Sequence, residues 1–130
     1  MEGSAPRSSR SKIKNQKLKI KVIIQNSKIL IIDTSDSEKT VVGLEIEGKK
    51  HIIKGKSKIL KAQNVLPLIE KILKKYKLKP NDLTAIKVNT GPGSFTGLRV
   101  GVAVANTLAW ALKIPVNGKS QVIPRYKFDN

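Results

Sequence analysis

Residues 90–101 read TGPGSFTGLRVG and are the most specific stretch of the sequence. They lie between a short apolar segment and a long one, so they predict a turn that joins a strand to a helix. Glycines allow backbone conformations closed to other residues and let backbone amides approach an anion. Ser94 or Thr96 can cap the helix. The stretch indicates either an anion-binding loop or a tight turn packed against the neighbouring strand.

The residues after this turn predict a helix and a short strand. Residues 94–112 are small and apolar at nearly every position, which is typical of a helix buried between layers or against a partner. Residues 114–116, Ile-Pro-Val, then predict the last strand.

The residues before the turn predict three strands, a helix and a fourth strand. Residues 29–32 are a continuous apolar run that fits a buried central strand. Residues 39–47 and 50–55 predict two antiparallel strands joined by a turn at 47–50. Residues 57–77 have helical spacing, with a kink or a break expected at Pro67. Residues 83–89 predict the strand that enters the turn.

The order β-β-β-α-β-α-β predicts an α/β fold. Three antiparallel strands followed by crossover units favour a mixed five-stranded sheet with the helices packed on it. The expected strand order is 3-2-1-4-5.

The composition excludes several kinds of site. There is no cysteine, so disulfides, thiolate metal sites and cysteine nucleophiles are excluded. The single histidine, His51, cannot make a histidine-rich zinc site and fits a surface or edge position. No run of apolar residues reaches the length of a transmembrane helix, so we expect no membrane span.

The charge is strongly positive, with 26 Lys and Arg against 9 Asp and Glu, a net charge of +17. Such a field attracts polyanions such as RNA, and the attraction falls with salt. The alternative is a compositional bias, because most of these residues are lysines and aromatic residues for base stacking are few.

The chain divides into three parts. Residues 1–28 predict a basic, flexible tail, within which residues 13–24 fit either an extra edge strand or no structure. Residues 29–118 predict one compact lobe, and residues 119–130 a C-terminal extension.

The string GPGSFTGLRVG closely resembles the signature of the TsaB (YeaZ) family. Other segments agree with that family in the same order: ILIIDTS at 29–35, VLPLI at 65–69, the strand at 82–86 and IPV at 114–116. The resemblance covers about residues 29–118.

The resemblance implies an actin-like, ribonuclease-H-like lobe in a cytoplasmic, non-catalytic protein without a cofactor. Its partners would be a TsaD-like catalytic subunit and a TsaE-like ATPase, which together place threonylcarbamoyl on a tRNA adenosine next to the anticodon. The two helices would dock TsaD or a second copy, and tRNA could contact the basic surface. Loops facing an inter-lobe cleft, where related folds hold a nucleotide or anion, would contain Asp33, Thr34, Ser35, Gly91, Gly93, Ser94, Thr96 and Gly97. The partner interface would contain Ile59, Ala62, Leu66, Ile69, Leu73, Leu98, Arg99, Val102, Ala105, Asn106 and Ala109.

Two departures from the family pattern affect this expectation. The family normally carries a second lobe, which we expect to be absent from this chain. Gln63-Asn64 stands where the family usually has His-Ser-Glu.

Asp33 alone, without a second carboxylate or a general base, makes a poor phosphotransfer site, and capping of its own loop amides is the simpler role. We therefore expect no catalytic residue and no metal site.

Three alternatives stay open. The chain could be a nucleotide-binding lobe of the ATPase or sugar-kinase class, with Asp33 at the nucleotide. It could be an RNA-binding accessory protein that uses the basic residues of 1–28. It could also be a truncated product that only dimerises.

Overall fold

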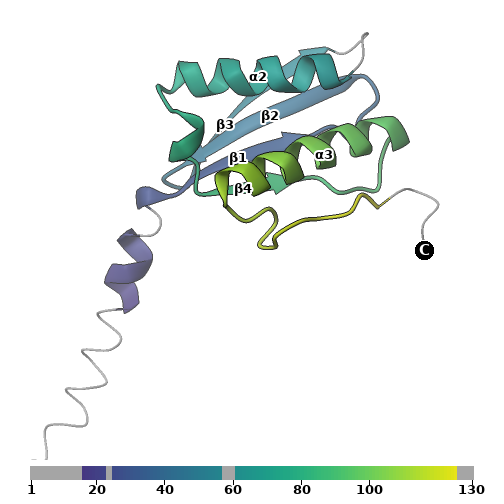
Figure 1. Cartoon of the computed structure of the whole chain (residues 1–130). Coiled ribbons are helices and arrows are strands. Elements are labelled where there is room, and N and C mark those ends of the chain that lie inside the picture. Colours follow the sequence, from purple (N-terminus) through teal and green to yellow (C-terminus); the bar gives the residue numbers. More distant parts are fainter. Residues whose placement is uncertain (1–15, 23–24, 57–60, 126–130) are drawn as a thin grey trace, which may run out of the picture.

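The computed structural model describes residues 16–22, 25–56 and 61–125, and its centre is a four-stranded sheet (Figure 1). The strands are β1 (Lys28–Asp33), β2 (Lys39–Ile46), β3 (Lys49–Lys56) and β4 (Ala85–Val88), in the order β3-β2-β1-β4. β2 runs antiparallel to β1 and β3, and β4 runs parallel to β1. This order confirms the predicted arrangement of the first four strands, 3-2-1-4.

The predicted fifth strand is reduced to a single bridge. Val116 pairs with Ile86 of β4, flanked by hydrogen bonds that join Ile86 to Pro115 and to Asn117. The backbone then reverses, because Asn117 and Gly118 both have positive φ angles, 50° and 75°. Asn-Gly is a strong signal for a two-residue turn, and it ends the strand after one pair. The prediction of a fifth strand in the sheet was therefore wrong, although Val116 lies beside β4 as expected.

The side chain of Asn117 continues the missing strand for one more residue. Its Oδ1 accepts a hydrogen bond from Val88 N and its Nδ2 donates one to Val88 O, each at 2.9 Å. The edge of β4 is thereby satisfied by an amide side chain where a backbone amide would otherwise pair.

The predicted hairpin between β2 and β3 is confirmed. Its turn consists of Glu47 and Gly48, whose φ angles are 53° and 84°. Two consecutive residues with positive φ fit the tight turns that match the twist of antiparallel strands.

Two helices pack on the sheet, α2 (Lys61–Lys75) and α3 (Phe95–Leu112), and a 3-10 turn, η1 (Pro80–Asp82), leads into β4. α2 contains Pro67 and is one helix from Lys61 to Lys75, so the expected break into two pieces does not occur. α3 ends at Lys113, which adopts the left-handed conformation common after a helix.

One face of the sheet forms the core. Leu30 and Ile32 of β1 are fully buried, whereas Ile29 and Ile31, which point to the other face, are half-buried. α2 and α3 supply most of the remaining core side chains: Val65, Ile69, Ile72, Leu73, Leu98, Val102, Ala105 and Ala109. The opposite face carries Ile52, which is 50% exposed.

α3 also meets the length and composition of a membrane-spanning helix, with 18 residues and a mean hydropathy of 1.3. One such helix is weak evidence for a span, because core helices of soluble proteins have the same composition. In this structure α3 packs against β1, β4 and α2, but only six of its 18 residues are buried. The expected burial of the helix between two layers is therefore not observed, and one side of α3 is open.

Residues 16–22 form a short helix whose residues are all exposed (Figure 1). The extra edge strand considered for this part of the chain is therefore not formed at these residues. Residues 1–15 and 23–24 lie outside the described part.

Candidate functional site

The loop that enters α3 is shaped by one glycine and one cap. Gly91 has a φ of 113°, and a Cβ at this position would meet the backbone of Arg125 and lie 2.9 Å from Leu98 Cδ1. Its amide donates to Asn89 Oδ1 at 2.9 Å. Ser94 is the residue that caps the helix, since its Oγ accepts a hydrogen bond from Gly97 N at 3.3 Å. Of the two capping residues that the sequence left open, the structure uses Ser94.

The loop after β1 is closed by its own carboxylate. Asp33 Oδ1 accepts hydrogen bonds from Ser35 N at 3.0 Å and from Ser35 Oγ at 2.6 Å. Asn89 Nδ2 donates to the same oxygen at 3.3 Å. The capping role expected for Asp33 is therefore confirmed, with Asn89 as an additional partner.

Asn89 was missed by the sequence analysis, although a signal for it existed. It follows the last residue of β4, and β4 runs parallel to β1. Carboxyl ends of parallel neighbours meet at one edge of the sheet, so a polar residue there lies beside Asp33.

The two loops are hydrogen-bonded to each other. Ser94 N donates to Ser35 O at 2.8 Å, and Thr34 Oγ1 donates to Gly97 O at 2.5 Å. Thr34 is fully buried, so its hydroxyl is occupied inside the chain. A Cβ at Gly93 would lie 2.7 Å from Ser35 Cβ. The two loops, which the family resemblance assigned to an inter-lobe cleft, thus lie against each other, and the close packing explains the small residues.

Thr96 lies apart from these loops. It is exposed and lines a groove on the outer side of α3, so it does not join the polar cluster around Asp33. Whether the paired loops bind a nucleotide or another anion stays a prediction.

Most residues expected at a partner interface lie in the core. Six of them have at most 6% of their surface exposed: Ile69, Leu73, Leu98, Val102, Ala105 and Ala109. Their helical spacing marks the face that packs on the sheet, and the sequence could not distinguish that face from an interface. These six assignments are corrected to core residues.

The other five interface candidates are exposed, half-buried or without a described side chain. Leu66 of α2 is 54% exposed, and Arg99 of α3 is also exposed. Asn106 is half-buried and holds the C-terminal segment through hydrogen bonds with Val122 N and O at 2.9 and 2.8 Å. Ile59 lies outside the described residues, and for Ala62 only the helical backbone is described.

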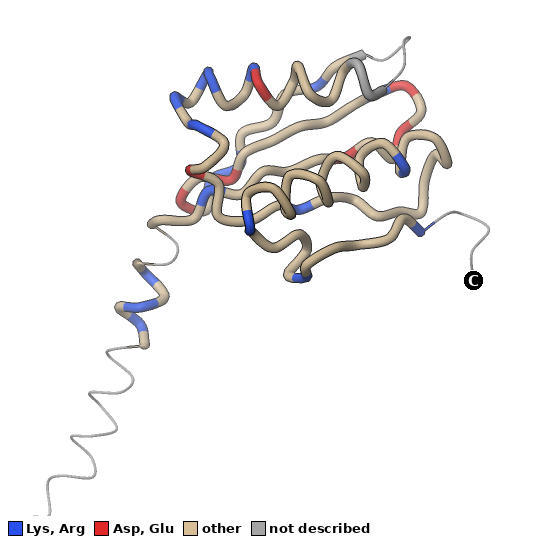
Figure 2. The backbone as a smooth tube through the Cα atoms, viewed as in Figure 1, with Lys and Arg blue, Asp and Glu red and all other residues tan. Residues whose placement is uncertain are grey.

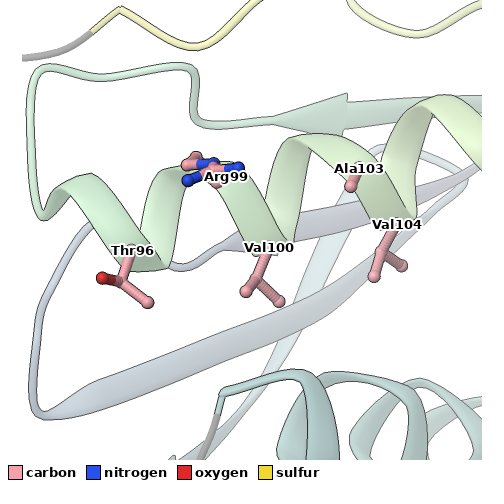
Figure 3. Close-up of a pocket in the computed structure, with 5 residues that line it drawn as sticks. All are labelled: Thr96, Arg99, Val100, Ala103 and Val104. Carbon is pink, nitrogen blue, oxygen red and sulfur yellow. The ribbon is translucent and has the colours of Figure 1, made fainter.

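The outer side of α3 carries an apolar groove of about 420 Å³. It is lined by Thr96, Arg99, Val100, Ala103 and Val104. Figure 3 shows Thr96, Val100 and Val104 in one row along the helix, with Arg99 and Ala103 beside them. The Arg99 guanidinium lies over the Phe95 ring, 5.4 Å from its centre, and keeps a positive charge at the edge of the groove.

Among the described residues, the His, Asp and Glu side chains away from the two loops form no catalytic cluster. His51 packs against Tyr76 with a centroid distance of 4.5 Å, in the contact between β3 and the end of α2. Within residues 16–22, 25–56 and 61–125, no three His, Asp or Glu side chains gather in the way that a metal site requires.

Comparisons with protein families, curated proteins and solved structures give consistent relatives for this chain. Residues 56–122 match the model of the family described as TsaD, tRNA N6-adenosine threonylcarbamoyltransferase. The tRNA threonylcarbamoyladenosine biosynthesis protein TsaB of Bacillus subtilis is 36% identical over 97 residues, which is 72% of this chain and 41% of that protein. The protein of the same name in Haemophilus influenzae is 38% identical over 93 residues, which is 72% of this chain and 39% of that protein.

A solved structure agrees with these relatives. YeaZ from Pseudomonas aeruginosa superposes with a TM-score of 0.65 at 36% identity, over 69% of this chain and 42% of that protein. The chain thus spans about two fifths of the length of the relatives it matches. The match to the family model, the TsaB relatives and the shared fold agree, and the chain belongs to the TsaD/TsaB family of tRNA threonylcarbamoyladenosine proteins, within its TsaB (YeaZ) group.

Proposed function

We propose that the chain is a non-catalytic subunit of the cytoplasmic machinery that makes threonylcarbamoyladenosine in tRNA. In this role it docks a TsaD-like catalytic protein through the outward faces of α2 and α3. The TsaB relatives carry this biosynthesis in their names, and the family model carries the name of the transferase.

The observation that carries the docking proposal is the apolar groove on the outer side of α3. Its row of Thr96, Val100 and Val104 is free of charge, and only Arg99 brings a charge to its edge. Leu66 adds a half-exposed apolar side chain on α2. The helices α2 and α3 contact each other. Apolar centres with a charged edge are typical of protein interfaces.

The non-catalytic role is supported by the way the polar groups are used. Asp33 accepts hydrogen bonds from its own loop and from Asn89, and Ser94 caps α3. A nucleophile or general base would need a partner that activates it, and Ser94 has none of the required kind among the described residues. The groups of the two loops stabilise the entry to α3.

The proposal extends to the fold and to further partners. Three antiparallel strands followed by a parallel one, in the order β3-β2-β1-β4, support an actin-like, ribonuclease-H-like lobe. A TsaE-like ATPase would join the complex of the two proteins. A second copy of this chain would use the same outer faces of α2 and α3 when the TsaD-like protein is absent.

The experiment is size-exclusion chromatography with light scattering, on the chain alone and mixed with the TsaD-like protein of the same organism. We expect a one-to-one complex. Leu66→Asp and Val100→Asp should each weaken it by roughly ten-fold or more, because a charge is then buried at an apolar contact. The matched control is Ile52→Asp, which adds the same charge at a residue of similar exposure, 50% against 54%, on the opposite face of the sheet.

The outcomes separate the alternatives. Loss of the complex in the two helix variants, with the Ile52 variant unaffected, supports docking through α2 and α3. Absence of any complex with the unmodified chain contradicts the proposal. A complex that only Ile52→Asp disrupts would place the interface on the open face of the sheet.

A further inference from the structure

Trp110 is the only tryptophan in the chain, and 81% of its surface is exposed. It lies in the last turn of α3, four turns of helix beyond Thr96 at the other end. At about 1.5 Å per residue the two positions are roughly 20 Å apart along the helix axis. Tryptophan is buried to a high degree in most proteins, so this side chain is prominent on the surface.

Two grooves meet at Trp110. The larger, about 600 Å³, runs between the end of α3 and the segment after it. The smaller, about 450 Å³, lies on the side of Asn106. Trp110 and Ser120 line both grooves, so the indole ring borders each of them.

The chemistry of the grooves differs from that of an apolar docking site. Lys113 and Lys119 line the larger groove, and within the described residues neither has a carboxylate partner. Thr107, Ser120 and Gln121 give the smaller groove hydroxyl and amide groups. An aromatic ring thus lies between two cations on one side and neutral polar groups on the other.

Within the described residues, α3 and the segment after it carry no acidic side chain. From Leu83 to Arg125 the sequence contains five basic residues and no acidic residue. Figure 2 shows this directly: the tube of α3 and of the segment after it carries blue positions and no red ones. The acidic residues that the structure describes lie on the strands, on their loops, on η1 and on α2. The partner of this surface should therefore be an anion.

We propose that Trp110 is a stacking platform for an unpaired base of single-stranded RNA, with the flanking phosphates at Lys113 and Lys119. Aromatic side chains in a cationic groove are the usual means of holding single strands, because every base presents a flat face and every phosphate a charge. The choice of RNA rests on the proposed function, whereas the stacking site rests on Trp110 and the two grooves.

The single tryptophan makes the test direct, since all indole fluorescence comes from Trp110. The full chain is titrated with a ten-nucleotide oligoadenylate and, in parallel, with inorganic polyphosphate of equal charge. We expect the oligoadenylate to quench the emission and the polyphosphate to bind without quenching, because only the former has bases to stack.

The variants are compared by the anisotropy of a labelled oligoadenylate, which does not depend on the indole. Trp110→Ala should weaken binding by about ten-fold, and Trp110→Phe should retain most of it. Lys113→Ala and Lys119→Ala should each reduce the slope of log affinity against log salt by about 0.7. The matched control is Phe95→Ala, which removes the other exposed aromatic side chain of α3 and should leave the affinity unchanged.

Three results would overturn the proposal. One is equal affinity of Trp110→Ala and the unmodified chain for the oligoadenylate, and another is equal quenching by polyphosphate. The third combines two observations: the emission of Trp110 shifts to the blue when the TsaD-like protein is added, and Trp110→Ala leaves RNA binding unchanged. Together they would show that the surface around Trp110 contacts protein. Leu66→Asp should leave RNA binding intact, so failure of docking and failure of stacking are distinguishable.

Discussion

The side chains at the two ends of α3 have different environments. At the N-terminal end Gly97, Leu98 and Gly101 are buried, and the backbone is hydrogen-bonded to the loop after β1. At the C-terminal end Trp110 and Lys113 are exposed, and two grooves open beside them. Small and polar residues at the N-terminal end join two loops, and side chains at the C-terminal end are exposed, where we propose that RNA binds.

The difference in packing between the two ends of α3 follows from the positions of its glycines. Gly97 and Gly101 lie one helical turn apart, on the same side of α3. Without side chains at these positions the helix approaches Thr34 closely enough for the hydrogen bond to Gly97 O. The signature thus has a packing role that stands on its own, whether or not the loops also hold an anion.

The strongest test of the N-terminal end is Gly101→Ala. In an exposed helix this change would stabilise by up to about 1 kcal/mol. Here the new Cβ would collide with Thr34 Oγ1, which is buried and cannot move aside. We expect a loss of about 2 kcal/mol in the free energy of unfolding, measured by urea denaturation.

The control for this prediction is the double variant Thr34→Ala, Gly101→Ala. Removing the hydroxyl makes room for the new methyl group, so the two changes together should cost less than their separate effects added. Stabilisation by Gly101→Ala alone would show that this end of α3 is not tightly packed.

A medium effect is expected where the C-terminal segment is attached. Asn106→Ala removes both hydrogen bonds to Val122 and should cost about 1 kcal/mol. The amide of Val122 should also exchange its hydrogen faster, as measured by NMR. Thr107→Ala is the control, because among the described residues the Thr107 hydroxyl donates to Ala103 O of its own helix and not to the C-terminal segment. Unchanged exchange at Val122 would mean that other contacts hold the segment.

The smallest effect is expected at Trp110. Trp110→Ala should change the free energy of unfolding by no more than about 0.5 kcal/mol, because the ring is exposed and buries little surface on folding. The measurement is the same urea denaturation, followed by circular dichroism. A loss similar to that of Gly101→Ala would make Trp110 a structural residue and remove the contrast between the two ends.

Much of the fold could be predicted from the sequence, because its signals are local. The run at 29–32 and the alternation in 39–47 and 50–55 correctly predicted the meander of β1, β2 and β3. The short fifth strand predicted at 114–116 is a single bridge, because the chain turns at Asn117 and Gly118, although Asn-Gly was visible in the sequence. The segment at 13–24 alternates like a strand, yet the described residues 16–22 are helical.

The candidate site was less predictable than the fold. The family resemblance assigned the loops at 33–35 and 91–97 to an inter-lobe cleft, and the structure shows that they are hydrogen-bonded to each other. The sequence could not separate core from interface on α2 and α3, because an apolar helix face fits either role. It also named neither Asn89 nor Trp110.

The sequence by itself determined the order of strands and helices, the hairpin at Glu47-Gly48, the cap of α3 by Ser94 or Thr96, and the family signature. Each of these depends on residues close together in the chain. Only the tertiary structure decided that Thr34 is bonded to Gly97, that Asn117 completes the edge of β4, and that Trp110 lies between two grooves. These depend on residues far apart in sequence, whose contacts arise only when the helices pack on the sheet.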